Sequence, residues 1–209
     1  MKKIFLSILC VLAFNFCRAD SPLTSTEFYK AYIDLPQVQL ALKTKGRICQ
    51  ETLKYIATAT TPLDVKLAII NAIGWSNNGT QNSKTYMNYI LKTKKYKSGK
   101  NSKRSTFLWH ATADELICFA YILAMENYFD VTYANSIAEQ AVSKNPNSYV
   151  LKLFASLIKA QGLCALNEWC YAVVEIKNIE QNTDLNFDLK TQGKKIISDY
   201  INSIDANCN

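Results

Sequence analysis

Hydrophobic and polar residues alternate with the period of α-helices along most of the chain. The longest such stretch is Thr106 to Asp130, and its middle, Leu116 to Met125, is apolar on every side. A helix that is hydrophobic all round is a buried helix, so we expect this stretch to be the element around which the others pack. Asp114 and Glu115 suit a first turn, so the regular helix is expected to begin near Thr112 or Ala113.

Shorter segments with helical periodicity lie on both sides of this stretch. They cover residues 28–33, 38–42, 48–57, 65–75, 86–91, 131–145, 150–158, 169–179 and 185–204. No stretch shows the strict alternation of a half-buried strand, and residues 20–23 are expected to be a short tail. The pattern predicts an all-α fold of stacked antiparallel helical hairpins, either an α-α superhelix or an irregular bundle, with about nine or ten helices.

The first residues resemble an export signal rather than part of the fold. Lys2 and Lys3 precede an apolar run from Ile4 to Phe16, and Ala19 ends a Cys17-Arg18-Ala19 segment suited to cleavage after Ala19. The run of about 13 apolar residues is shorter than the roughly 20 that span a membrane. Lipid attachment at Cys17 is the disfavoured alternative because Phe16 is bulky. We expect residues 20–209 to form one periplasmic or secreted domain without a transmembrane segment.

The overall composition is that of a globular protein, with 49% hydrophobic and 20% charged residues. Removal of residues 1–19 takes away three positive charges, so the formal net charge falls from +7 to +4. This mild excess does not indicate nucleic-acid binding. The basic residues are concentrated between Lys92 and Arg104, which hold seven lysines and arginines and no acid. We expect an exposed loop here, and any boundary between subdomains falls within 92–105.

The basic segment supplies the candidate binding residues. They are Lys94, Lys95, Tyr96, Lys97, Lys100, Lys103 and Arg104. Such a cationic segment suits an acidic protein or another acidic surface. Two alternatives stay open: a solvated loop without a partner, and a surface-associated structural protein that the loop holds in place.

A catalytic function has weaker support. His110 is the one histidine, and an i,i+4 arrangement on a single helix would place it beside Asp114, with Glu115 next in the chain. A small exported hydrolase using His110 with Asp114 or Glu115 is therefore the alternative hypothesis. The sequence lacks a GxSxG nucleophile motif and glycine-rich phosphate loops, and one histidine is too few for a usual metal site, so no cofactor or metal is expected.

Five cysteines remain after the predicted cleavage, an odd number that leaves at least one outside any intramolecular disulfide. Cys164 and Cys170 flank a short segment and are the candidate disulfide. Cys118 falls within the buried helix, where we expect a small core residue. The pairing of Cys49 and Cys208 stays open.

Two segments resemble helical-repeat families. Ala134, Ala138 and Ala141 followed by Pro146-Asn147 resemble a tetratricopeptide unit over residues 117–162, although Ile122 stands where that motif has a small residue. Residues 61–75, with Pro62, Asp64, Val65 and Lys66, resemble the opening of a HEAT repeat. Both families form arrays of helix pairs that mostly bind proteins or peptides. We therefore expect an exported protein-binding module, such as an inhibitor, an immunity-type protein or a scaffold.

Overall fold

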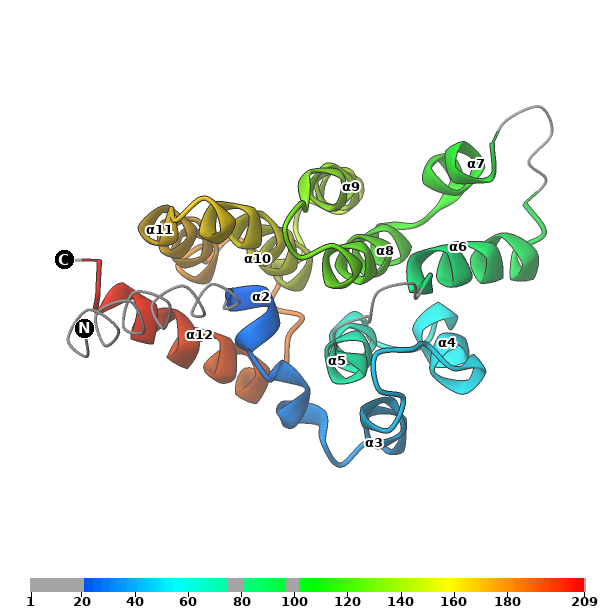
Figure 1. Cartoon of the computed structure of the whole chain (residues 1–209), viewed down its shortest axis with the longest axis horizontal. Coiled ribbons are helices and arrows are strands. Elements are labelled where there is room, and N and C mark those ends of the chain that lie inside the picture. Colours follow the sequence, from blue (N-terminus) through cyan, green and yellow to red (C-terminus); the bar gives the residue numbers. More distant parts are fainter. Residues whose placement is uncertain (1–20, 75–80, 97–101, 209) are drawn as a thin grey trace, which may run out of the picture.

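The computed structural model describes residues 21–74, 81–96 and 102–208, which form helices joined by turns and loops (Figure 1). The elements are α2 (Pro22–Ser25), the 3-10 helix η1 (Phe28–Tyr32), α3 (Pro36–Leu42), α4 (Gln50–Ala57), α5 (Leu63–Ile73), α6 (Asn82–Thr93), α7 (Lys103–His110), α8 (Ala113–Glu126), α9 (Thr132–Lys144), α10 (Tyr149–Ala165), α11 (Trp169–Glu180) and α12 (Thr191–Asp205). Within the described ranges, β-pairing is limited to one isolated bridge. The predicted all-α fold is confirmed.

Helix α8 occupies the centre of the molecule, with α5, α6, α9 and α10 packed around it (Figure 1). Residues 115–122 of this helix are all buried. Its start is fixed by a capping box: the Thr112 hydroxyl accepts a hydrogen bond from the Glu115 amide, and the Glu115 carboxylate accepts one from the Thr112 amide. The prediction of a buried central helix beginning at Thr112 or Ala113 is confirmed.

The predicted element 106–130 is nevertheless two helices. Helix α7 ends at His110, and Ala111 and Thr112 adopt extended backbone before α8 begins. The capping box explains the break, because a Thr112 that caps α8 cannot also continue α7. The boundary of α7 corrects the basic loop as well: Lys103 and Arg104 are the first residues of a helix, whereas residues 97–101 lie outside the described part of the chain.

Helices α8 and α9 form one hairpin, α10 and α11 form the next, and α10 packs on both helices of the first. The N-terminal elements α2 and η1 fill the space beside α10 and α12. There the rings of Phe28 and Tyr121 both contact Phe154, at centroid distances of 5.2 and 5.4 Å. The prediction of a tail at residues 20–23 is wrong for Ser21, Pro22 and Leu23, which are buried because α2 closes this part of the core.

The C-terminal part departs from the predicted boundaries in two places. Helix α10 continues through Gly162 to Ala165, because Gly162 does not adopt the left-handed backbone conformation that often ends a helix. Helix α12 begins at Thr191 rather than near Leu185, because the preceding segment pairs with the start of α10. In that segment the Asp188 carboxylate accepts hydrogen bonds from the Ser148 hydroxyl at 2.5 Å and the Val150 amide at 2.8 Å. Across the described ranges, every helix falls short of the length and apolar character needed to cross a membrane.

Candidate functional site

The candidate functional site is a basic and aromatic surface where the end of α6 and the whole of α7 meet the start of α8, at one end of the molecule (Figure 1). We call this surface the α7 corner. It consists of Lys94, Lys95, Tyr96, Lys103, Arg104, Trp109 and His110. It contains five of the seven predicted binding residues, and the other two, Lys97 and Lys100, lie outside the described residues.

Helix α7 is anchored by one face only. Phe107 is fully buried, with its ring 4.9 Å from that of Phe119 and 6.4 Å from that of Tyr86. The Ser102 hydroxyl accepts a hydrogen bond from the Ser105 amide and caps the helix start. Trp109 follows Phe107 by two residues, or about 200° around the helix, and therefore points outward. Its side chain is 81% exposed, the largest value among the described large hydrophobic residues.

The C-terminal end of α7 is held from two sides. The ring of His110 stacks on that of Tyr96 at a centroid distance of 4.7 Å and an interplanar angle of 20°, which ties the turn after α6 to α7. The Lys144 ammonium of α9 donates a hydrogen bond to the Ala111 carbonyl at 2.6 Å and reaches the Trp109 carbonyl at 3.5 Å. A cation at a helix C-terminus also interacts favourably with the negative end of the helix dipole. These contacts restrain the backbone that carries Trp109.

Two cations of the α7 corner already contact other side chains, and two are exposed to solvent. The Lys94 ammonium lies 2.7 Å from the buried Glu115 carboxylate. Desolvation alone lowers the pKa of Lys94, but the hydrogen bond and charge of Glu115 outweigh it and raise that pKa. The Arg104 guanidinium lies 5.2 Å from the centre of the Tyr133 ring, which orients it. Lys95 and Lys103 are exposed and extend the positive surface.

The residues proposed for hydrolysis do not share the single helix that the hypothesis requires. His110 ends α7, whereas Asp114 and Glu115 belong to the first turn of α8. The two carboxylates are occupied: Asp114 lies 3.1 Å from the Lys66 ammonium, and Glu115 serves the capping box and Lys94. Among these described residues no hydrogen bond or ion pair joins His110 to either acid, so a base and its carboxylate partner are not assembled.

The buried ion pair behind the α7 corner has a structural role. The Lys66 side chain is only 4% exposed, and that of Asp114 is 37% exposed. Removing Asp114 would leave the buried Lys66 ammonium without its counter-charge at the junction of α5 and α8. Cys118 lies within this cluster, and burial raises the pKa of its thiol far above the ordinary value. This supports the expectation of an unreactive core residue.

The predicted disulfide between Cys164 and Cys170 is wrong. Cys170, in the first turn of α11, pairs instead with Cys208 after α12, with a Cα–Cα distance of 5.5 Å. Cys164 is buried on α10 and lies outside the disulfide. Cys49 and Cys118 are outside the disulfide too. Within the described ranges, histidine, cysteine and acidic side chains nowhere gather in the threes or fours that hold a metal.

Sequence reasoning identified the basic residues of the α7 corner but did not include Trp109 among the candidate binding residues. The usable signal was its position two residues after Phe107, since only one of the two can face the core. Lys144 was missed because its contact with Ala111 spans 33 residues.

No protein-family model, curated protein or solved structure matches this chain.

Proposed function

We propose that the protein is an exported helical binding module that docks an acidic surface of another protein on the α7 corner. The observation that carries this proposal is the exposure of Trp109 on a short helix that also carries the exposed cations Lys103 and Arg104. Tryptophan, tyrosine and arginine are the residues that most often dominate the energy of protein interfaces. A solvated segment without a partner, by contrast, gains no free energy from exposing an indole to water.

The fixed geometry of the α7 corner supports binding as well. Phe107, the Tyr96–His110 stack and Lys144 restrain α7 before any partner arrives, so little conformational entropy remains to be lost on association. The exposed Lys95 and Lys103 add a positive field that accelerates encounters with acidic surfaces and weakens at high salt. An acidic protein surface offers apolar groups to the indole and carboxylates to the cations.

An exported location is part of the proposal. The predicted signal at residues 1–19 supports it, and the Cys170–Cys208 disulfide supports it independently, because disulfides persist mainly in oxidising compartments. The disulfide closes a loop with a sequence separation of 38 residues.

The test is site-specific photo-crosslinking in the native source. A photoreactive phenylalanine analogue placed at position 109 should capture one predominant acidic protein, and replacing Lys95, Lys103 and Arg104 together by Ser should abolish the capture. The matched control carries the same analogue at Phe129, an equally exposed aromatic on the α8–α9 turn. If both positions capture the same proteins, or if the triple Ser variant is captured as well as the wild type, the proposal is wrong.

A further inference from the structure

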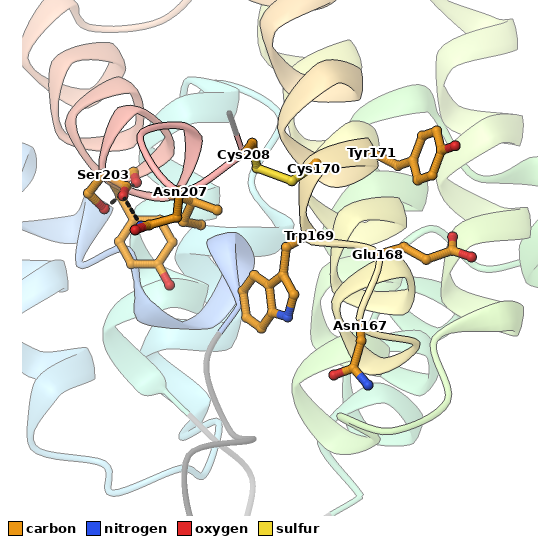
Figure 2. Close-up of a pocket in the computed structure, with 10 residues that line it drawn as sticks. Asn167, Glu168, Trp169, Cys170, Tyr171, Ser203, Asn207 and Cys208 are labelled. Carbon is orange, nitrogen blue, oxygen red and sulfur yellow. Dashed lines mark hydrogen bonds between the residues drawn. A yellow bond between two sulfur atoms is a disulfide. The ribbon is translucent and has the colours of Figure 1, made fainter. Parts of the chain in front are cut away.

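A second candidate site lies at the opposite end of the molecule from the α7 corner (Figure 1). It is a hollow of about 700 Å³ between the first turn of α11 and the last turn of α12, with the Cys170–Cys208 disulfide at its edge (Figure 2). We call it the C-terminal hollow. The side chains that matter for its chemistry are Trp169, Tyr200, Ser203, Ile204 and Asn207. Its volume falls within the range of small-molecule sites.

The indole of Trp169 forms one wall of the C-terminal hollow. It projects from the start of α11 toward α12, beneath the disulfide, whereas the side chains of Glu168 and Tyr171 point to the other side (Figure 2). Trp169 is partly buried against the hydrophobic core, which fixes the ring without covering it. An aromatic ring held in this way offers a flat surface for the apolar face of a ligand.

The facing wall at the end of α12 carries two polar side chains, Ser203 and Asn207, beside Tyr200 and Ile204. The Ser203 hydroxyl donates to the Tyr200 carbonyl at 2.7 Å, and the Asn207 amide donates to the Ser203 carbonyl at 3.1 Å. These bonds hold both side chains in place, yet the hydroxyl oxygen of Ser203 and the carbonyl oxygen of Asn207 can still accept hydrogen bonds. No lysine or arginine lines the hollow, so an anionic ligand would find no counter-charge in this part of the described chain.

We propose that the C-terminal hollow binds a neutral saccharide. A sugar ring presents a C–H face that stacks on an indole and hydroxyl groups at its edge that pair with amide and hydroxyl side chains, and Trp169, Asn207 and Ser203 supply these partners across the hollow. The disulfide and the ion pair between Lys177 and Asp205 hold α12 against α11 and so keep the two walls at a fixed separation. This site uses none of the residues of the α7 corner and is independent of the proposed protein docking.

The experiment titrates the mature chain, residues 20–209, with maltotriose, cellotriose and chitotriose by isothermal calorimetry. At least one trisaccharide should bind saturably at a single site. The Trp169→Ala variant should bind it at least about tenfold more weakly, since loss of one aromatic contact of this kind is sufficient for that change. Phe129→Ala removes an exposed aromatic elsewhere and should bind like the wild type.

A second variant guards against unfolding of Trp169→Ala. Ser203 is exposed on α12, so Ser203→Trp fills the hollow without touching the core and should abolish binding in a folded protein. Circular dichroism checks the helix content of each variant. The proposal is overturned if none of the three trisaccharides binds, if Ser203→Trp binds as well as the wild type, or if the site binds choline and no sugar, which would indicate a cation site.

Discussion

A tryptophan lies at each end of this molecule, and the two indoles have different surroundings. Trp109 is exposed on α7, which also carries Lys103 and Arg104, whereas Trp169 is partly buried beside amide and hydroxyl groups, and no lysine or arginine lines its hollow. The indole itself is the same, so the two proposals differ because of its surroundings: we propose an acidic protein surface for the α7 corner and a small neutral ligand for the C-terminal hollow.

The two ends also differ in how they are held together. The α7 corner depends on burial of Phe107, on the Tyr96–His110 stack and on a hydrogen bond from Lys144. The C-terminal hollow depends on a covalent bond between Cys170 and Cys208. We therefore expect mutations that disturb packing to disrupt the α7 corner, and reduction of the Cys170–Cys208 disulfide to disrupt the C-terminal hollow.

The largest effect is expected from Phe107→Ala. Phe107 is fully buried between Tyr86 and Phe119, and truncating such a ring costs about 3–5 kcal/mol of the free energy of unfolding. Urea denaturation followed by circular dichroism measures it. Trp109→Ala is the control on the same helix and should change stability by less than about 0.5 kcal/mol. A small effect of Phe107→Ala would mean that α7 is not anchored through its inner face.

The double variant Cys170→Ser/Cys208→Ser should lose about 2–4 kcal/mol, because the disulfide no longer restricts the unfolded chain over a separation of 38 residues. Urea denaturation with and without dithiothreitol measures the loss. The reductant should destabilise the wild type by a similar amount and leave the double variant unaffected. Equal stability of the oxidised wild type and the double variant would contradict the pairing.

A smaller effect is expected from Lys144→Met, which keeps most of the side chain but removes the donor to the Ala111 carbonyl. The expected loss is about 1 kcal/mol. Hydrogen exchange of the last amides of α7 should accelerate, while that of α11 stays unchanged. Lys92→Met, at an exposed position in the last turn of α6, is the matched control. Unchanged exchange in α7 would show that this contact does not restrain Trp109.

The smallest effect at neutral pH is expected from Tyr149→Phe, in the opposite direction. The hydroxyl of Tyr149 is buried, and within the described chain it has no hydrogen-bond partner, so its removal should raise stability by up to about 1 kcal/mol. Chemical denaturation at pH 8 measures the difference, with Tyr171→Phe as an exposed control that should show no change.

Alkaline pH tests the same residue. Burial, aided by the charge of Glu180, raises the pKa of Tyr149 in the folded state. The folded protein therefore keeps this proton above pH 10, while the unfolded chain releases it. The contribution of this proton to the free energy of unfolding is complete below about pH 10 and is lost as pH rises through the folded pKa. Between pH 8 and 11, Tyr149→Phe should lose about 1 kcal/mol less stability than the wild type. Identical losses would contradict the burial of this hydroxyl.

Helical periodicity was sufficient to predict the all-α fold and the buried α8, because both depend on patterns within one segment. The break between α7 and α8 was only half predicted: the Thr112 start signal was recognised, but the continuous apolar pattern across Ala111 concealed the gap. Ser102, which caps α7, is a start signal of the same kind within the basic segment.

Features that depend on contacts between distant segments were not predictable from local patterns. The short spacing between Cys164 and Cys170 favoured a disulfide between them, whereas Cys170 pairs with Cys208, which is brought close only by the return of α12. The same return creates the C-terminal hollow. The basic residues were predictable as a group, but the engagement of Lys94 by Glu115 required the packed structure.

The burial of Ser21 has a consequence for the order of events in biogenesis. Its side chain is inaccessible and donates a hydrogen bond to Gln161 at 3.2 Å, and Leu23 beside it belongs to the core. With cleavage after Ala19, as the sequence predicts, a single residue separates the scissile bond from this buried serine. A peptidase needs an extended, accessible chain, so cleavage at that predicted position would have to precede the docking of α2 on α10. On that prediction, α2 would complete this part of the core only after residues 1–19 have been removed.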